Sequence, residues 1–555
     1  MSGLGSAARM AEQLSGILLN YFAEAVLITI LGSAILLVWY RRAVTSEMRA
    51  APGAAAPPFV PDVPPATAAR GQALAPERVV RRVRARLIVV YTIAGMLAAA
   101  VLAKLFLVGL GEPPRGIQMF AVWYVYCWPL VPTYAALLAL SRRTSVWVAV
   151  GYVALGATLV LVWSLVSLAI MPERESTPLQ NVLRFLGFLG LEAALPFLII
   201  VALSGRRLRS VSAFLLAGLL VFSFGTLAVT HGFALSIDVP ALRALAERVG
   251  AGTFIASWFM VAALPIGFLC WSLLRWLSRA YELKSFSDVQ LIVDSWWLIA
   301  TFFFAISLAG SFGWGGLAAL VAFAGYRAAV ALGLWLWPQD RRARGARLLL
   351  LRVFGFQRRT ERLFDATAQL WRLFGSVHLI AAADLATRVI DPGDVITFMG
   401  GRLRDQFVTG EADIGRHLTR IDEAPDPDGR FRANEFFCHD ATWRPMLTAL
   451  LARSDAVLFD LRGFSPENSG CRFELGELAR TRLLSRTVIV VDDTTDTRLL
   501  AATLAETAPD FAAGGAGASS GPGALIERVR PQFPADLARV RRRLATVASA
   551  QGLGT

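Results

Sequence analysis

The fold of the C-terminal half is decided by residues 454–493, which read SDAVLFDLRGFSPENSGCRFELGELARTRLLSRTVIVVDD. The runs DAVLFDL and TVIVVDD are short, apolar and rich in β-branched or aromatic residues, which predicts two buried strands. The segment CRFELGELARTRLL between them has helical spacing. Two strands joined by a helix form a crossover unit of a parallel sheet, whose ligands bind at the carboxyl ends of the strands. We therefore expect a reactive site at the loop FSPENSGC and at Glu474, in the first turn of the helix.

The composition of the whole chain is that of a membrane protein. The 555 residues are too many for one domain, 55% are hydrophobic and 17% are charged, and the mean hydropathy is +0.54. The net charge of +14 comes almost entirely from arginine, because Lys104 and Lys284 are the only lysines. Much of this arginine lies between apolar segments, where it sets membrane topology, so no nucleic-acid partner is expected.

Nine apolar stretches are about as long as a membrane-spanning helix, which needs roughly 20 apolar residues. They are residues 18–40, 88–111, 118–140, 145–170, 185–204, 211–232, 253–274, 290–311 and 314–337. Residues 1–337 are therefore expected to form an α-helical multi-pass membrane domain in contact with the lipid bilayer. The Pro/Ala-rich segment at 47–80 is expected to be an extended cytoplasmic linker.

The basic residues predict the orientation of these spans. They follow or flank the odd-numbered spans, at Arg41, Arg42, Arg81, Arg82, Arg84, Arg86, Arg142, Arg143, Arg206, Arg207, Arg209, Arg275, Arg279, Lys284, Arg341, Arg342, Arg344 and Arg347. The other connections are poor in arginine or balance it with acid. The positive-inside rule then places the protein in the plasma (inner) membrane with its N-terminus outside and its C-terminal half in the cytoplasm. The N-terminus lacks the pattern of a cleaved signal peptide.

Three ionisable residues lie deep within the expected spans, namely Glu192, Asp294 and Arg327. Arg327 can pair with either acid, which predicts a structural ion pair; the alternative is a proton or solute pathway. The hydropathy shows no inverted repeat and no pair of helices broken by glycine or proline, the usual pointers to a transporter site.

From about residue 345 short apolar runs alternate with helical patterns, which is typical of an α/β domain with a parallel sheet. We expect strands at 347–356, 376–384, 455–461 and 487–493, a further short strand at 431–440, and helices at 360–375, 395–407, 442–454, 471–484 and 495–508. The α/β domain is assigned to 345–510. Residues 511–555 are expected to hold a flexible linker (512–523) and a basic helix (537–550) that forms a surface or membrane-facing appendage.

This order of elements resembles the Toll/interleukin-1 receptor (TIR) domain, a flavodoxin-like fold. The resemblance covers about 347–505 and is carried by VFGFQRRTERLF, RVIDPGDVI and ALLARSDAVLFDLRGFSPENSGCRFELGEL. TIR domains carry Ser, a spacer and Ser-x-x-Cys-x-x-Glu-Leu in the third part, which matches Ser465, Ser469, Cys471, Glu474 and Leu475. The chain departs from the family at Gly470, where an aromatic residue is usual, and in RVFGF at the end of the first strand. An insertion at 409–442 leaves two candidates, 395–407 and 442–454, for the helix between strands two and three.

The resemblance implies a chemistry for Glu474. In enzymatic TIR domains the glutamate of C-x-x-E is the catalytic acid of NAD hydrolysis, where a carboxylate stabilises an oxocarbenium-like centre. The alternative is that a first-turn glutamate stabilises the helix and stays ionised beside its positive end. The resemblance further nominates candidates for contacts with NAD, as substrate or ligand: Phe356, Arg388, Asp391, Arg462 and Ser465. It also implies self-association through the TIR-like domain.

Other reactive side chains have simpler interpretations. Cys471 is expected to be a small buried residue and not a nucleophile served by His378 or His439. Asp492, Asp493 and Asp496 resemble a metal or ribose cluster, but a turn that caps the next helix explains them as well, and no metal site is expected. His439 and Asp440 are expected to cap the helix that follows.

Three functions therefore remain. The first is a membrane-anchored signalling, sensing or scaffold protein, the second is a membrane-anchored NAD hydrolase, and the third is a transporter or channel regulated by the soluble domain.

Overall fold

The computed structural model of the chain describes most of its residues. They are residues 2–49, 76–109, 111, 116–170, 177–203, 218, 221–230, 232–233, 239–339, 345–353, 363–364, 367–381, 397–439, 441–509, 525–530 and 534–550. The expected linkers at 47–80 and 512–523 lie almost wholly outside these residues.

The chain divides into two compact units, and two of the boundaries fall inside continuous helices. The first unit contains the chain up to Leu37 and then Arg86–Pro338. The second contains the C-terminal half from Gln339 onward, together with the end of the first helix and the start of the second. Both helix ends were expected to belong to the membrane domain.

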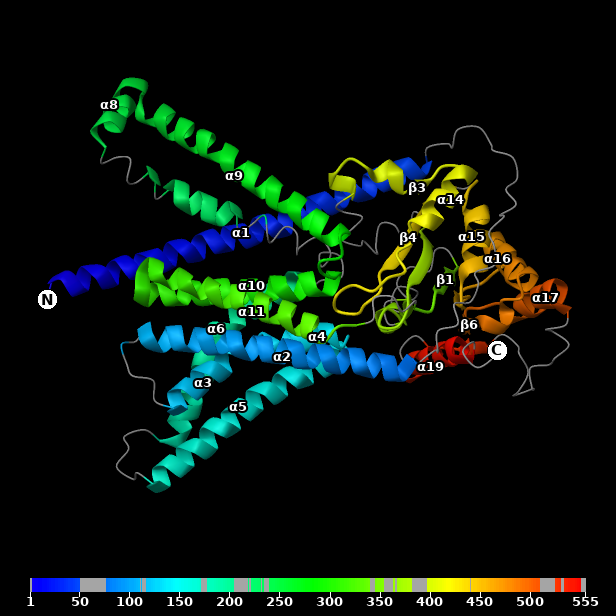
Figure 1. The fold of residues 1–555 in the computed structure, drawn as a ribbon, viewed down its shortest axis with the longest axis horizontal. Coiled ribbons are helices and arrows are strands. Elements are labelled where there is room, and N and C mark those ends of the chain that lie inside the picture. The colour runs from blue at the N-terminus through cyan, green and yellow to red at the C-terminus, as the bar shows by residue number, and fades with distance from the viewer. Residues whose placement is uncertain are drawn as a thin grey trace. The chain divides into compact units, whose positions relative to one another are not determined.

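Seven helices of the described chain are long and apolar enough to cross a membrane (Figure 1). They lie within α1 (Ser2–Arg49), α2 (Pro76–Gly109), α5 (Arg142–Ile170), α6 (Pro178–Leu203), α9 (Ala251–Glu282), α10 (Asp288–Phe312) and α11 (Ala319–Leu336) with the turn η1 (Gly313–Ala318) before it. Of the candidate spans, α10 is the most enclosed. In its most apolar stretch of 18 residues, 78% of the residues are buried, whereas in the corresponding stretch of α9 0% are buried. The chain is thus a multi-helix membrane protein.

Two of the nine expected spans are not among these seven. The expected span 118–140 consists of two short helices, α3 (Gly116–Tyr126) and α4 (Leu130–Leu137). The break falls at Pro129, which has no backbone N–H to continue the helical hydrogen bonds. The expectation of one continuous helix over 118–140 was therefore wrong. Of the span 211–232, the structure describes mainly a ten-residue helix, Val221–Thr230, and a shorter helix, α8 (Pro240–Val249), follows it.

The second unit is built on a parallel sheet of seven strands. The strands are β1 (Leu348–Arg352), β2 (Val377–Ala381), β3 (Phe407–Val408), β4 (Ala433–Cys438), β5 (Ala456–Asp460), β6 (Thr487–Val491) and β7 (Leu525–Arg528). Their order across the sheet is β3-β4-β2-β1-β5-β6-β7, and every pair is parallel. The central strands β1, β5 and β6 are buried at every position, as expected for a parallel sheet covered on both faces.

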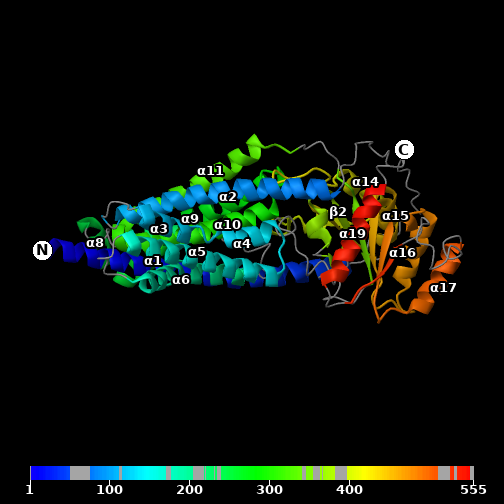
Figure 2. The same cartoon turned by 90° about the horizontal axis from the view of Figure 1, so that it is seen from below.

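Alternate residues of β1 point to two separate cores. Leu349 and Leu351 belong to a core completed by α14 (Glu411–Thr419), α15 (Trp443–Arg453), α16 (Ser469–Arg480) and α17 (Thr497–Thr507). Leu348 and Leu350 belong to a core on the opposite face, completed by Leu363, Phe364 and Trp371 and by α19 (Pro534–Ala550). Figure 2 shows α19 on one side of the strands and α16 and α17 on the other.

The last turns of α1 also contribute a core to this unit. Tyr40 and Val44 are buried against Leu403, Phe407 and Phe437, which come from β3, β4 and the turn before β3. The Tyr40 ring meets the ring of Phe398 edge-on, with centroids 5.5 Å apart. Glu47 adds an ion pair, at 2.8 Å, with the largely exposed Arg404, which contributes little by itself. The edge of the sheet at β3 and β4 is therefore packed against a helix, a common way of protecting a sheet edge.

Three local expectations were wrong. The region 395–407 was expected to be one helix; residues 397–399 are helical, but a 3₁₀ turn at Leu403–Gln406 then leads directly into β3. The sheet has two strands more than expected, β3 and β7. The basic helix near 537–550 is not an appendage, because Val540, Leu544 and Val547 lie in the core beside β1, β5 and β6.

The packing of α19 predicts a large stability loss on truncation of its apolar face. Leu544→Ala should destabilise the second unit by about 2–5 kcal/mol, because Leu544 is 1% exposed and the substitution leaves a cavity. Arg542→Ala, on the exposed face of the same helix, should change the stability by less than about 0.5 kcal/mol. Proteolysis of the full chain in detergent across a urea series measures both; equal effects of the two variants would contradict this packing.

Candidate functional site

The strand order marks one place in the sheet where a ligand site is expected. After β1 the chain builds β2, β3 and β4 on one side, and it then returns to build β5, β6 and β7 on the other. The order of strands thus reverses next to β1, between β1 and β5. In open parallel sheets, ligands bind outside the carboxyl ends of the strands at such a reversal.

Five polar side chains gather at the carboxyl ends of β1 and β5, and we call them the switch-point cluster. Arg352 is the last residue of β1 and pairs in register with Asp460, the last residue of β5. Arg462 follows β5 in the loop, and Cys471 and Glu474 come from α16. All five are at most 4% exposed. A parallel sheet thus brings together two arginines, two acids and a thiol from three segments of the chain.

Two members of the switch-point cluster form a salt bridge. Arg462 donates from Nε to Oδ1 and from Nη2 to Oδ2 of Asp460, both at 2.7 Å. This two-pronged geometry is the strongest that an arginine makes with a carboxylate. The guanidinium of Arg462 is thus engaged with Asp460, and its contact with NAD stays a prediction.

Glu474 lies in the interior and not at an open surface. It is the sixth residue of α16, which begins at Ser469, and it therefore lies beyond the first turn in which it was expected. Its Oε2 is buried without a hydrogen-bond partner among the described residues. Burial raises the pKa of Glu474 to about 8, while Arg352 and a hydrogen bond with Cys471 act in the opposite direction. The expectation that the helix dipole keeps this carboxylate ionised is therefore wrong, because desolvation dominates.

Cys471 is enclosed in the same interior. Its thiol lies 3.7 Å from the carbonyl oxygen of Arg352. Burial raises the pKa of the thiol far above its ordinary value, and the negative charges of Glu474 and Asp460 raise it further. A thiol that resists ionisation is a poor nucleophile, which agrees with its expected role as a small buried residue.

The loop between β5 and α16 is held by its own polar groups. Gly463 has φ +78°, a conformation that glycine adopts readily. The backbone N–H and the hydroxyl of Ser465 both donate to the side-chain oxygen of Asn468, at 2.8 and 3.0 Å. Ser465, predicted to contact a cofactor, therefore closes this turn.

The remaining predicted ligand contacts cannot be placed beside this cluster. Phe356, Arg388 and Asp391 lie outside the described residues, as do most of the segments VFGFQRRTERLF and RVIDPGDVI. They follow β1 and β2 in the chain, and their assignment stays a prediction.

Neither histidine that was considered for catalysis belongs to the cluster. His378 is the second residue of β2, next to Leu349 in the register, and so lies toward the amino ends of the strands. Burial lowers its pKa to about 3, with Arg347 and Arg453 adding to the effect. His439 lies at the end of β4, where its backbone N–H donates to Thr442 at 3.0 Å. Thr442, and not His439, is the residue that precedes the first turn of α15.

The acids after β6 form a turn and a helix cap. Asp496 accepts hydrogen bonds from the backbone N–H groups of Arg498 and Leu499 and so caps α17. Asp492 accepts from the backbone of Thr494 at 2.9 Å, and Asp493 pairs with Arg528 at the surface. Among the described residues, no group of three or more His, Cys, Asp or Glu side chains is arranged to hold a metal ion.

Neither Arg352 nor Asp460 was predicted from the sequence to belong to the site. A signal was present, because each is a charged residue that ends a run of buried apolar residues, in LLLLR and AVLFD. A charge at the carboxyl end of a buried parallel strand lies at the edge where ligands bind, and it must find a partner there.

The membrane unit contains a second set of buried polar groups. Arg327 on α11 forms an ion pair with Asp294 on α10, so Asp294 is its partner and Glu192 is not. Glu192 on α6 accepts a hydrogen bond from Ser307 on α10, at 2.7 Å from Oε1. The two acids are thus separated within the bundle, and they differ in whether a cation neutralises them.

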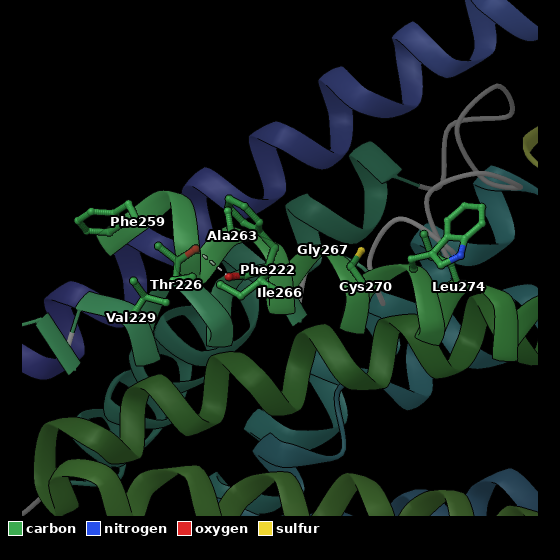
Figure 3. Close-up of a pocket in the computed structure, with 11 residues that line it drawn as sticks. Phe222, Thr226, Val229, Phe259, Ala263, Ile266, Gly267, Cys270 and Leu274 are labelled. Atoms are coloured by element: carbon green, nitrogen blue, oxygen red, sulfur yellow. Dashed lines mark hydrogen bonds between the residues drawn. The ribbon is translucent and has the colours of Figure 1, made fainter. Parts of the chain in front are cut away.

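A cavity of about 490 Å³ lies between the helix Val221–Thr230 and α9 (Figure 3). Its lining is almost entirely apolar, and the hydroxyl of Thr226 is already bonded to the carbonyl oxygen of Phe222 at 2.9 Å. Its other polar groups are the thiol of Cys270 and the indole N–H of Trp271, and none of the lining side chains is charged.

Comparisons of the chain with protein-family models, with curated proteins and with solved structures find no match. Its class therefore rests on its own fold, which is that of a membrane protein with a C-terminal parallel α/β domain.

The raised pKa of Glu474 predicts a pH-dependent stability. Because the folded-state pKa, about 8, exceeds the unfolded value of 4.5, the folded state binds the proton more tightly. The contribution of Glu474 to the free energy of unfolding is therefore fully present below pH 4.5 and is lost as the pH rises through about 8. A shift of this size corresponds to a few kcal/mol.

Glu474→Gln, which mimics the neutral acid, should remove the loss of stability that the parent protein shows as the pH rises. Unfolding of the full chain in detergent at pH 5, 7 and 9 should show the variant gaining stability relative to the parent as the pH rises. Glu477→Gln, at an exposed ion pair of the same helix, serves as the control. If the stability of the parent and that of Glu474→Gln change in parallel with pH, Glu474 is ionised in the folded protein.

Proposed function

We propose that the chain is a membrane-anchored signalling protein, in which the spans hold and bias a cytoplasmic TIR-like domain. The observation that carries the proposal is the packing of α1. Its candidate span, Leu19–Met48, ends in residues that form part of a core of the α/β unit. Tyr40 is 1% exposed and Val44 is 0% exposed, against side chains of β3 and β4.

A continuous helix that is buried at one end can transmit a movement. Because packed cores have discrete arrangements and do not deform continuously, a rotation or shift of α1 would change the packing of Tyr40 and Val44. The strands that receive them, β3 and β4, come from the inserted part of the domain. A membrane event could in this way bias the conformation of the domain, which is what a sensor requires.

The TIR-like assignment rests on the strand order and on the motif of α16. Without the inserted β3 and β4, the order of the strands is β2-β1-β5-β6-β7, which corresponds to the flavodoxin-like order 2-1-3-4-5. The helix after the third strand of this order carries Cys471 and Glu474 in the C-x-x-E spacing. The cytoplasmic location follows from the positive-inside pattern, and self-association of the domain is part of the proposal.

The coupling through α1 can be tested by hydrogen exchange of the full chain in lipid nanodiscs. Val44→Asp places a charge among Phe407, Phe437 and Leu403 and should speed amide exchange in β3 and β4 at least tenfold, because a buried unpaired charge costs several kcal/mol. Exchange in α17, which belongs to a different core, should be unchanged. Ser46→Asp, at an exposed position of the same helix, is the matched control. Unchanged exchange in β3 and β4 would refute the coupling.

A second candidate function, NAD hydrolysis by Glu474, is favoured by one observation. The Oε2 atom has no hydrogen-bond partner among the described residues, at the edge of the sheet where a ligand is expected. Against it stands the burial of the side chain, which is 4% exposed. Catalysis would require the cluster to open.

The two functions predict different results in one assay. If the domain signals without catalysis, the full chain in membranes should not consume NAD above the level of Glu474→Gln. Turnover that is lost, by a hundredfold or more, in Glu474→Gln but retained in Glu477→Gln would instead establish the hydrolase.

A further inference from the structure

The two buried acids of the membrane unit are neutralised differently. Asp294 has the guanidinium of Arg327 as its counter-charge. Glu192 is 1% exposed, and among the described residues its hydrogen-bond partner is the neutral hydroxyl of Ser307. Its Oε2 is buried without a hydrogen-bond partner in the described part of the chain.

Aromatic rings close the surroundings of Glu192. Tyr126, at the end of α3, interacts electrostatically with Glu192, and its own hydroxyl is buried without a partner among the described residues. The Tyr126 ring lies 4.4 Å from that of Phe304 and 6.2 Å from that of Phe188, centroid to centroid. Phe188 in turn lies 5.2 Å from Phe106 of α2. The acid is therefore enclosed in an apolar part of the bundle.

Among the described residues, no salt bridge joins a basic side chain of the neighbouring helices to Glu192. α6 packs against α3, α5 and α10. The hydroxyls of Tyr124 on α3 and Tyr152 on α5 are bonded to backbone carbonyls. Lys104 of α2 and Arg184 of α6 are exposed, and Asp294 of α10 is paired with Arg327. Asp294 is also 13 residues from Ser307 along α10, about 20 Å at 1.5 Å per residue.

An ionised carboxylate in these surroundings would be very costly. A charge within an apolar, membrane-embedded bundle needs a counter-charge or a set of hydrogen bonds, and Glu192 has one neutral donor. The carboxyl end of α3, where Tyr126 lies, carries a partial negative charge that further disfavours an anion. A proton on the carboxyl group removes both of these energetic costs.

We propose that Glu192 is a proton-binding site of the membrane unit, formed with Ser307 and Tyr126 between α3, α6 and α10. The protonated acid accepts from Ser307 and stabilises the packing of α6 on α10; loss of the proton leaves an anion that this packing does not accommodate. A metal cation fits the site poorly, because Ca²⁺, for example, takes six to eight oxygen ligands. The described residues offer only the two carboxyl oxygens and two hydroxyls.

Infrared difference spectroscopy of the full chain in lipid nanodiscs tests the proposal directly. A protonated, buried carboxyl group has a C=O stretch well separated from the bands of ionised carboxylates. At pH 7 the parent protein should show this band beside the one from the protonated Glu474. Glu192→Gln should lose only the Glu192 band, Glu474→Gln should lose only the other, and Asp294→Asn should keep both. Ser307→Ala removes the hydrogen bond to Oε1 and should shift the band to higher frequency.

Two results would overturn the assignment. Identical carboxyl C=O bands in the parent and in Glu192→Gln between pH 5 and pH 8 would show that Glu192 is ionised. A band that disappears when sodium or calcium chloride is added at constant pH would make the site a cation site. Should Glu192→Gln fail to fold, an unshifted band in Ser307→Ala would by itself refute the proposed geometry.

Discussion

The enclosure of β1 is the constraint on which the second unit depends. Every residue of this strand is buried, and its neighbours β2 and β5 occupy both of its edges. A strand so placed needs apolar helices on both faces of the sheet. The chain supplies them from distant segments, with α14–α17 on one face and Leu363, Phe364, Trp371 and α19 on the other.

The same enclosure explains the chemistry of the switch-point cluster. Where β1 and β5 end, Arg352 and Asp460 carry charge into an interior that the surrounding helices have already closed. Asp460 is neutralised by Arg462, and Glu474 retains its proton at neutral pH because burial outweighs the attraction of Arg352. Replacing one member of such a group is costly, because it leaves another buried charge without compensation. The cluster therefore stabilises the junction of three segments whether or not a ligand ever binds there.

Much of this architecture could be predicted from the sequence, and the exceptions have physical reasons. Parallel strands such as AVLFD and TVIVV were evident because both faces are buried and the apolar run is continuous. The membrane helices were predicted by length and hydropathy, but a window of apolar residues does not register the break at Pro129. The helix α19 was misinterpreted because its arginines dominate the composition, although Val540, Leu544 and Val547 follow helical spacing. The burial of Glu474 was not predictable, because it depends on how α16 is rotated against β1 and β5, which no local pattern specifies.

The position of α19 has a consequence for how the protein is made. Its apolar residues fill the space beside β1, although nearly two hundred residues separate the two segments in the chain. During synthesis the membrane helices and β1 to β6 emerge before α19, so the part of this sheet face that Leu363, Phe364 and Trp371 do not cover stays exposed until α19 has been translated. Exposed apolar sheet surface favours aggregation. The time between translation of β6 and arrival of α19 is therefore the period in which a nascent chain of this protein most needs a chaperone.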